Sequence, residues 1–600
     1  MKHLLKYLKD YKKETFLAPL FKLLEASFEL FVPLVMAQII DVGIAGRNGE
    51  YVWNMSLLMV ALGIIGLICA VTAQFFSAKA AVGFAAKVRH ALFAHIQSLS
   101  FTELDTLGTS SLITRMTSDV NQVQHGVNMV LRLFLRSPCI VFGAMIMAFT
   151  IDVKGALIFV VTIPLLSLIV FGIMMITMPL YKKAQAGLDL ILQNTRENLT
   201  GIRVIRAFNK EKEEQEQFEH NNRELTKMQK HVGKISGLMN PFTYVIINGA
   251  TVLLIWQGAF QVDLGIITQG ALIALVNYMS QILVELVKLA NLIMTITKAL
   301  ASANRVAAIL DVKSSMEDTK AHLIEGTKEN TKEDIVLSRT MRHNNMSEKN
   351  ENEALAVSFE HVFLTYAGAG EEALTDIHFS VKKGETIGII GGTGSGKSSV
   401  VHLIPRFYDA TKGNVFVHGI DVKEYPKHNL RDMIGIVPQK ATLFKGTIRE
   451  NLCWGNAHAT DEELWEALDI SQAKEFVEKK RDGLETKISQ SGKNLSGGQR
   501  QRLTIARALV KKPEILILDD SASALDFATD AKLRMALKTL KNQTTVFIVS
   551  QRASSIMHAD QILVLDDGKI VDIGKHDVLL SRCDIYREIY ESQFQKSKEA

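Results

Sequence analysis

The first half of the chain alternates long apolar stretches with short or charged connections. Six stretches are long enough to cross a hydrocarbon core of about 30 Å as helices. They run approximately over Phe16–Ile44, Trp53–Ala78, Leu131–Thr150, Gly155–Met178, Pro241–Phe260 and Ile266–Thr295. Only a short turn at Ile151–Lys154 separates the third stretch from the fourth. The pattern therefore predicts a bundle of six membrane-spanning helices in contact with the lipid bilayer.

The charges between these stretches predict which side of the membrane each connection faces. Lysines crowd the segment before the first stretch, and Lys and Arg are frequent in the two long connections, about 80–130 and 180–235. The short loops near Arg47, Lys154 and Asp263 hold few positive charges. Because cytoplasmic loops carry the excess of Lys and Arg, both termini and both long connections are expected in the cytoplasm. Structureless loops of such length are uncommon, so the long connections should be mostly helical extensions.

The pattern changes after residue 310. A polar, charged segment at 311–356 has an extreme part, His343–Glu353, without Phe, Tyr or Trp, which predicts a solvated linker. A regulatory or docking role for this linker is the alternative. Beyond it, short apolar runs predict the strands of an α/β domain at Val357–Tyr366, Thr386–Ile390 and Ile515–Asp519.

A glycine-rich loop follows the second of these strands. Its residues, which fit the pattern G-x-x-x-x-G-K-[ST], are Gly391, Gly392, Thr393, Gly394, Ser395, Gly396, Lys397 and Ser398. Such a loop turns backbone N–H groups onto phosphate oxygens, while Lys397 brings a positive charge to the phosphates and Ser398 a hydroxyl to Mg²⁺. Asp519 ends a buried strand, from which its carboxylate can reach the same ion. These residues predict a site for ATP and Mg²⁺.

The composition narrows the class of protein only slightly. A chain of 600 residues is too long for one core, and its 48% hydrophobic content is high for a soluble protein. The net charge of +5 is modest and requires no nucleic-acid partner. Four cysteines lie far apart without metal-like spacing, which indicates isolated reduced thiols: Cys69, Cys139, Cys453 and Cys583. The basic N-terminus leads into an apolar stretch without a small-residue cleavage site, so it is expected to be a cytoplasmic flank.

The segment Leu495-Ser496-Gly497-Gly498-Gln499 is the most specific motif in the chain. With the phosphate loop and Asp519, it resembles the signature of the ATP-binding cassette (ABC) family, and the apolar half resembles the exporter branch of that family. The resemblance implies that Ser496, Gly497, Gly498 and Gln499 face the ATP of a partner cassette, where amides at a helix start favour an anion.

The same resemblance assigns roles to other positions. Tyr366 would stack on adenine, and Ser399 would join the phosphate loop in binding ATP. Gln439, in Val437-Pro438-Gln439, would sense Mg²⁺ and contact the membrane domain, so the expected metal site is Ser398, Gln439 and Asp519. Asp526 would lie in the loop that crosses to the partner cassette. The segments around Leu107–Asp119 and Glu197–Ile205 resemble those that carry coupling helices.

Two positions nearest the chemistry depart from the family pattern. Asp520 stands where the family usually has Glu, and Gln551 stands where it usually has His; Gln490 also replaces a frequent Glu. An aspartate retracts the carboxylate by about one C–C bond, and a misplacement near 1 Å can cost about a hundredfold in rate. Glutamine cannot carry the charge of an imidazole. With Asp520 and Gln551 in the catalytic positions, the site is expected to bind ATP but to hydrolyse it poorly.

Ionisable residues within the apolar stretches remain ambiguous at this stage. Glu25 and Glu29 share a helix face, as do Glu285 and Lys288. The sequence leaves open whether these carboxylates line a substrate cavity or make structural pairs. Arg132 and Arg136 are expected to snorkel toward the cytoplasmic surface.

The sequence therefore predicts an all-α six-helix transmembrane domain at 1–310, a polar linker at 311–356, and an α/β P-loop nucleotide-binding domain at 357–600. The resemblance implies a half-transporter in the cell membrane that pairs with a second half, as a heterodimer in which this chain carries the degenerate ATP site. Its expected substrate is a small drug-like or lipid-like amphiphile, whose identity the sequence does not give. A slow homodimeric exporter and an ATP-gated channel or membrane regulator are the alternatives.

Overall fold

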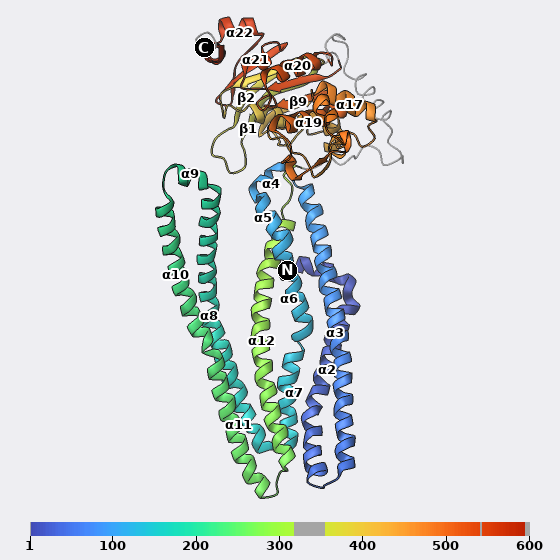
Figure 1. The fold of residues 1–600 in the computed structure, drawn as a ribbon, viewed down its shortest axis with the longest axis vertical. Helices are drawn as coiled ribbons and strands as arrows, with labels where there is room; N and C mark the ends of the chain where they lie inside the picture. The colour runs from blue at the N-terminus through green and yellow to red at the C-terminus, as the bar shows by residue number, and fades with distance from the viewer. Residues whose placement is uncertain (1, 317–354, 541–542, 595–600) are drawn as a thin grey trace. The chain divides into compact units, whose positions relative to one another are not determined.

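The chain folds into two compact units in the computed structural model, which describes residues 2–316, 355–540 and 543–594 (Figure 1). The helical unit comprises Met1–Gln97 and Thr109–Val312. The α/β unit comprises Lys313–Ala600 together with Ser98–Gly108, a segment that lies between two helices of the first unit in the sequence. A short piece of the N-terminal half is thus packed with the C-terminal half.

Long helices build the helical unit. Its helices are α1 (Lys2–Leu5), η1 (Lys6–Tyr11), α2 (Lys12–Gln38), η2 (Ile39–Ile44), α3 (Gly49–Ser98), α5 (Thr109–Thr114), η3 (Arg115–Asp119), α6 (Val120–Leu133), α7 (Arg136–Ile151), α8 (Val153–Thr200), α9 (Ile202–Ala207), α10 (Glu211–Gly237), α11 (Met239–Asp263) and α12 (Gln269–Leu310). Helix α4 (Phe101–Leu107) belongs to the α/β unit.

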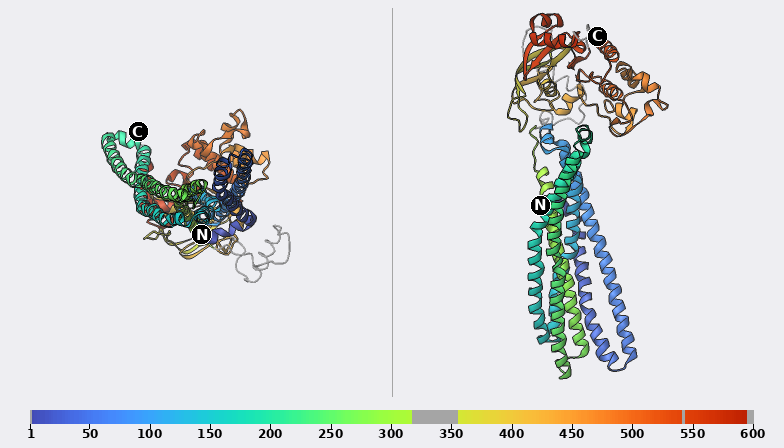
Figure 2. Two further views of the ribbon diagram at one scale, coloured as in Figure 1. Left: turned by 90° about the horizontal axis from the view of Figure 1, so that it is seen from below. Right: turned by 60° about the vertical axis from the view of Figure 1, so that its left-hand side comes forward.

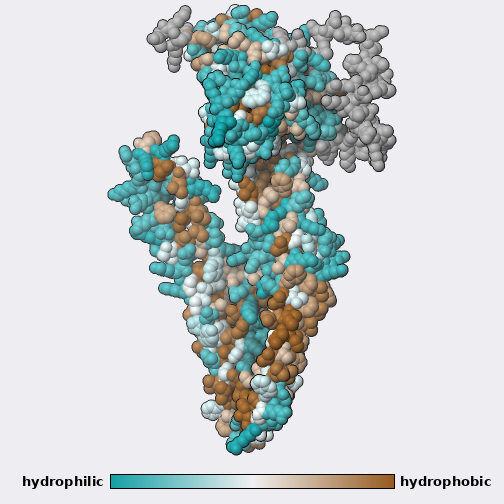
Figure 3. All heavy atoms as spheres, turned by 45° about the vertical axis from the view of Figure 1, so that its right-hand side comes forward, coloured by the Kyte–Doolittle hydropathy of each residue, from teal (hydrophilic) through white to brown (hydrophobic). Residues whose placement is uncertain are grey.

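Six helical segments in the described residues are long and apolar enough to cross a membrane, which confirms the predicted number of spans. Their environments differ. Of the most apolar window of α12, 44% is buried, and this helix contacts α2, α6, α7, α8 and α11. The corresponding figure for α3 is 6%, although its window is more apolar. Figure 3 shows apolar side chains gathered in the lower part of the helical unit. Helix α12 is therefore the centre of the unit, and α3 lies on its outer face.

Both long connections are helical, as predicted. Helix α3 continues to Ser98, and α8 and α10 form a long hairpin joined by the short helix α9 (Figures 1 and 2). The sharp turn before α8 is stabilised by Asp152, whose carboxylate accepts a hydrogen bond from Gly155 N at 2.6 Å. This cap explains how two apolar helices, α7 and α8, are separated by one residue.

A cluster of paired charges lies among α2, α7 and α12, and it corrects the prediction for Arg136. The guanidinium of Arg136 does not snorkel: the residue is only 7% exposed. It lies 2.6 Å from the carboxylate of Glu285 and 2.7 Å from that of Glu29. Ser137 and Lys288 also donate to Glu285, each at 2.8 Å. Within a membrane-spanning segment, pairing with carboxylates from two other helices makes the buried Arg136 less costly than an unpaired charge.

The α/β unit is built of short elements. Its strands are β1 (Leu355–Leu364), β2 (Leu374–Lys382), β3 (Thr386–Gly391), β4 (Lys412–Val417), β5 (Ile420–Asp421), β6 (Ile434–Val437), β7 (Gly446–Thr447), β8 (Lys487–Ile488), β9 (Ile515–Asp519), β10 (Thr545–Val549), β11 (Gln561–Asp566) and β12 (Lys569–Gly574). Its helices after α4 are α14 (Lys397–Leu403), α15 (Lys427–Asp432), α16 (Ile448–Leu452), α17 (Asp461–Ile470), α18 (Lys474–Glu478), η4 (Gly483–Glu485), η5 (Gln490–Gly492), α19 (Gly497–Val510), α20 (Phe527–Lys538), α21 (Ala553–Ile556), α22 (His576–Arg582) and α23 (Asp584–Phe594).

A six-stranded sheet of order β12-β11-β3-β10-β9-β6 divides the core of this unit. All five residues of β9 are buried, and successive side chains point to opposite faces. Ile515 and Ile517 pack into the cluster shared with the second, four-stranded sheet β2-β1-β4-β5, whereas Leu516 and Leu518 pack into the helix-covered cluster. Burial on both faces explains why β9 reads as a continuous apolar run and not as an alternating one.

The predicted strands lie close to the observed ones. The strand predicted at Ile515–Asp519 is β9 itself, and those predicted at Thr386–Ile390 and Val357–Tyr366 correspond to β3 and β1 within two residues at each end. Most of the predicted linker, from 317 to 354, lies outside the described residues. The last helix before it ends at Leu310, and β1 begins at Leu355.

Candidate nucleotide-binding site

Four neighbouring strands of the six-stranded sheet deliver the predicted site residues to one edge. Strands β3, β10, β9 and β6 are parallel, so their carboxyl ends lie on the same side. The phosphate loop follows β3, Gln551 follows β10, Asp519 and Asp520 end β9, and Gln439 follows β6. In open α/β sheets, ligands bind in the crevice at this edge. Residues that span more than 150 positions in the sequence therefore meet there.

The phosphate loop is shaped by its glycines. A Cβ at Gly391 would lie 2.1 Å from the carbonyl oxygen of Leu565, so no larger residue fits against β11. Gly396, with φ of +89°, turns the chain directly into α14. The loop thus brings backbone N–H groups to the start of α14, which favours bound phosphate.

Lys397 lies inside the loop. The residue is buried, and its ammonium donates to the carbonyl oxygen of Gly391 at 2.9 Å and also to that of Gly392. Burial lowers the pKa of Lys397, while the carboxylates of Asp520 and Asp519 act to raise it. A nucleotide phosphate would offer this ammonium a stronger, charged acceptor than either carbonyl group.

Ser398 and Asp519 form the oxygen pair expected for a metal ion. The Ser398 hydroxyl donates to Asp519 Oδ1 at 2.9 Å, and Asp519 is only 2% exposed. A hydroxyl and a carboxylate are the ligand types that Mg²⁺ prefers alongside phosphate oxygens and water, so these residues fit the ion. His402 Nε2 lies 3.5 Å from the other oxygen of Asp519, and burial lowers the pKa of His402 against the opposing effect of that carboxylate.

Asp520 and Gln439 meet at the same edge. Gln439 Nε2 donates to Asp520 Oδ2 at 3.4 Å, and the backbone of Asp520 has a φ of +44°, unusual for a residue other than glycine. Burial raises the pKa of Asp520, with the Gln439 hydrogen bond acting in the opposite direction. The structure therefore brings together the carboxylate predicted to act on water and the amide predicted to sense Mg²⁺.

The side chain of Gln551 is exposed, and its loop is held from the C-terminal helix α23. Gln593 of α23 donates to the carbonyl oxygen of Gln551 at 2.8 Å and accepts from Ala553 N at 2.9 Å. The amide of Gln593 thus fixes the backbone on both sides of Arg552. No motif in the sequence pointed to Gln593.

Tyr366 follows β1 and reaches the phosphate loop through its hydroxyl. The hydroxyls of Tyr366 and Ser399 are hydrogen bonded at 2.9 Å, so the structure joins two residues predicted to bind ATP. The ring of Tyr366 packs against the apolar core between the two sheets. Burial raises the pKa of Tyr366, so the phenol stays protonated near neutral pH.

The Leu495–Gln499 segment starts helix α19 with a capping box. Ser496 Oγ accepts from Gln499 N at 3.2 Å, and the Gln499 side chain accepts from Ser496 N at 3.1 Å. The pattern S-x-x-Q is typical of such a cap, so this capping box could have been predicted from the sequence. Among the described residues, nothing lies within 4 Å of the position that a Cβ at Gly497 would take. The helix start is therefore open on the side of Gly497.

Asp526 also acts as a helix cap. Its carboxylate accepts from Thr529 N at 2.8 Å and from Thr529 Oγ1 at 2.9 Å at the start of α20. The backbone hydrogen bond from Thr529 is the main cause that lowers the pKa of Asp526. Gln490 is exposed at the start of η5. Among the described residues, neither forms a hydrogen bond or ion pair with the phosphate loop.

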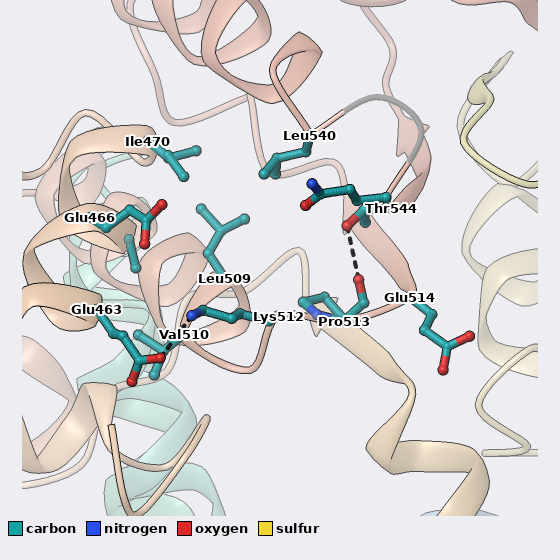
Figure 4. A pocket seen from close by; sticks show the side chains of 12 residues that line it. Glu463, Glu466, Ile470, Leu509, Val510, Lys512, Pro513, Glu514, Leu540 and Thr544 are labelled. Carbon is teal, nitrogen blue, oxygen red and sulfur yellow. Dashed lines mark hydrogen bonds and ion pairs between the residues drawn. The ribbon is translucent and has the colours of Figure 1, made fainter. Parts of the chain in front are cut away.

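A cavity of about 270 Å³ lies at the opposite edge of the sheet (Figure 4). It is lined by α17, by the end of α19 and by Pro513 and Glu514, which precede β9. Lys512 and Glu463, which form an ion pair at 2.7 Å, both line it. None of the predicted nucleotide-binding residues lines this cavity.

Comparison with known proteins agrees with this geometry. Residues 15–286 match the model of the ABC transporter transmembrane region, and residues 374–523 match the model named ABC transporter. The chain is 35% identical over 594 residues to the uncharacterized ABC transporter ATP-binding protein YfiB of Bacillus subtilis (strain 168), and the match covers 99% of both chains. The chain belongs to the ABC transporter family. It is a half-transporter, with one transmembrane region and one ATP-binding domain.

Two further similarities extend over nearly the whole chain. The protein YgaD of Bacillus subtilis (strain 168), named provisionally as a multidrug export ATP-binding/permease protein, is 31% identical over 606 residues and is covered to 99%, as is this chain. The solved structure of a bacterial Atm1-family ABC exporter with ATP bound has a TM-score of 0.76 at 22% identity and covers 97% of this chain and 98% of its own. The latter similarity establishes the ABC exporter fold.

Three side chains near the nucleotide-binding site were not predicted from the sequence. His402 beside Asp519 lies one turn into α14, where the sequence showed only an apolar run. Tyr408 contacts the ring of Tyr366 from the chain after α14. Gln593 comes from the last described helix. Two strands lie in the sequence between Tyr366 and Tyr408, and two lie between Gln551 and Gln593. Only the folded chain therefore brings these residues together.

Proposed function

We propose that this chain is one subunit of an ATP-driven exporter that moves a small amphiphile out of the cytoplasm. Two half-transporters would form the working unit, with ATP and Mg²⁺ between their ATP-binding domains. Both termini and the ATP-binding domain would face the cytoplasm, as the distribution of Lys and Arg indicates. The coverage of both ABC family models and the similarity to an exporter fold support this proposal.

Within that unit, this chain would contribute the weaker catalytic site. The main support comes from the carboxyl ends of β9 and β10. The carboxylate of Asp520 accepts a hydrogen bond from Gln439, and Gln551 follows the neighbouring strand. The carboxylate is one methylene shorter than glutamate, and misplacement near 1 Å can cost about a hundredfold in rate. Glutamine at 551 supplies a hydrogen bond but no positive charge. ATP binding would persist, because Lys397, Ser398 and Asp519 are all in place.

The Leu495–Gln499 segment would serve the partner's ATP. The start of α19 is free to receive an anion on its open side, since Gly497 faces open space and Ser496 is exposed. A partner with glutamate and histidine at the positions of Asp520 and Gln551 would then hydrolyse ATP against this chain's intact signature. A heterodimer follows from this asymmetry.

The experiment compares the purified chain alone with the chain co-expressed with such a partner. Alone, it should bind a fluorescent ATP analogue and hydrolyse ATP slowly; with the partner, hydrolysis should rise by about a hundredfold. Fast hydrolysis by the chain alone would show a homodimer with a competent site.

A second experiment separates a pump from an ATP-gated channel. Inside-out vesicles that contain the assembled protein should accumulate the amphiphilic cation ethidium against its gradient when ATP is added. Equilibration of ethidium without accumulation would favour the channel.

A further inference from the structure

Helix α4 is the part of the N-terminal half that packs with the α/β unit. Ser100 and Glu103 form a capping box at its start, and Glu103 Oε1 accepts from Ser315 N at 3.0 Å. The ring of Phe101 lies 4.6 Å from that of Phe407 and 6.1 Å from that of Tyr408. Helix α4 therefore packs against the segment that follows α14.

One polar contact connects α4 to this segment. The hydroxyl of Tyr408 donates to Asp105 Oδ2 at 2.6 Å. Burial raises the pKa of Tyr408 strongly, and the nearby Asp105 carboxylate raises it further, so the phenol remains the donor at any physiological pH. A short hydrogen bond to an ionised acceptor is stronger than one between neutral groups.

Tyr408 also contacts the nucleotide-binding site. Its ring meets that of Tyr366 edge to face, with centroids 5.0 Å apart and planes at 89°. Tyr366 in turn shares its hydroxyl hydrogen bond with Ser399, the second residue after Lys397. The contacts thus run without a gap from Asp105 through Tyr408 and Tyr366 to the phosphate loop.

There is room beside this chain of contacts for the rings to turn. A cavity of about 540 Å³ is lined by Thr102, Asp105 and Thr106 of α4 on one side, and by Tyr366 and Tyr408 on the other. Aromatic rings in a close-packed core are locked by their neighbours, whereas rings that border a cavity can reorient without overpacking.

We propose that Tyr408 is a positioning residue that transmits nucleotide binding at Tyr366 and Ser399 to helix α4. A nucleotide that stacks on Tyr366 or binds Ser399 competes with the hydrogen bond between them. Tyr366 then changes its edge contact with Tyr408, whose hydroxyl is fixed to Asp105. This inference rests on the proposed function, because it requires that the phosphate loop bind ATP.

The test measures hydrogen exchange in residues 101–107 of the full-length chain in lipid nanodiscs, with and without ATP and Mg²⁺. In the parent, ATP should change exchange in α4 by at least about fivefold, the lower end of a typical coupling between two sites. Tyr408→Phe keeps the ring but removes the donor to Asp105. It should abolish the ATP-dependent change, while the half-saturating concentration of a fluorescent ATP analogue moves by less than about threefold, since Tyr408 is not among the residues proposed to bind ATP.

Two further variants separate the contact from general damage. Asp105→Ala should reproduce the loss, and Asp105→Asn, which keeps an acceptor oxygen, should restore part of the response. Tyr425→Phe removes a hydroxyl that donates to Val417 O at 3.1 Å elsewhere in the same unit, and it should respond like the parent. Coupling energy between Asp105 and Tyr408 can be read from the double-mutant cycle.

The outcomes distinguish this inference from the proposed function. An equal ATP response in α4 of the parent and of both Tyr408→Phe and Asp105→Ala overturns the relay, as does a parent that binds the analogue without any change in α4. If the parent binds no ATP analogue at all, the proposed ATP-driven function fails, and the relay fails with it.

Discussion

The carboxyl edge of the six-stranded sheet, called here the ATP edge, and the charged cluster of the helical unit each hold a buried cation, but with different acceptors. At the ATP edge, Lys397 is held by backbone carbonyl oxygens, which a phosphate can replace. In the helical unit, Arg136 is held by the carboxylates of Glu285 and Glu29, which match its charge. A cation paired with weak acceptors is ready for a ligand, whereas a cation paired with two carboxylates stabilises the helices that carry them.

The first test of this difference concerns the helical unit, where the largest effect on stability is expected. Arg136→Leu leaves Glu285 buried with only Lys288, which is 42% exposed, as a charged partner, and breaking a buried pair in this way costs about 3–5 kcal/mol. The thermal unfolding midpoint in nanodiscs should fall sharply. Affinity for a fluorescent ATP analogue should remain that of the parent in the protein that stays folded.

The matched control removes both charges. Arg136→Leu combined with Glu285→Leu leaves Glu29 and Lys288, whose side chains are 41% and 42% exposed and can be solvated. The double variant should be more stable than Arg136→Leu alone, because no buried charge is left unpaired. A double variant as unstable as the single one would show that Arg136 stabilises the bundle through packing and not through charge.

The second test concerns the ATP edge and should give the reverse pattern. Lys397→Ala removes a charged donor to phosphate, and such hydrogen bonds contribute about 1.5–3 kcal/mol. Affinity of the chain for the ATP analogue should fall by about 10- to 150-fold, with little change in the unfolding midpoint. A large loss of stability without loss of affinity would mean that Lys397 is a structural residue like Arg136.

A smaller effect is expected at Tyr366. Tyr366→Phe removes the hydrogen bond to Ser399 but keeps the ring, and a neutral hydrogen bond contributes about 0.5–1.5 kcal/mol. Affinity should change by less than about tenfold, in either direction, because the lost bond also competes with the nucleotide. Tyr366→Ala should weaken binding further by removing the stacking surface. Equal affinities for both variants would show that the ring does not contact the base.

The smallest effect is expected for the linker. Deletion of residues 317–354 should leave folding and ATP hydrolysis close to those of the parent, since that composition cannot bury a core. The deletion begins after Met316 because Ser315 N donates to Glu103 and Met316 O accepts from Lys427. ATPase rates near background in the shortened protein would assign the linker a docking role.

What could be predicted from the sequence was local in the chain. The six spans, strand β9 and the phosphate loop each depend on residues within one segment, so periodicity and motif spacing were sufficient. The parallel order of β3, β10 and β9 then explains why the separate motifs meet.

The missed features depend on contacts between distant segments. Arg136 and Glu285 are 149 positions apart, and Asp105 and Tyr408 are 303 apart. Each residue alone reads as an ordinary charged or aromatic side chain. Their partners are fixed only when the distant segments pack together, which no local pattern reports. The capping box of Ser496 and Gln499 is different, because its S-x-x-Q spacing was visible in the sequence.

Two substitutions in the assembled transporter test most directly whether this chain carries the weak site and lends its signature to a partner. Asp520→Asn should lower total ATP hydrolysis only slightly. Ser496→Arg places a bulky cation at the open start of α19 and should lower it by at least about 10²–10³-fold, the cost of losing one donor to developing charge. Ser581→Arg, which places the same cation on the exposed face of α22, should stay near the parent rate. If Asp520→Asn is the more damaging change, the site of this chain drives hydrolysis and the account is wrong.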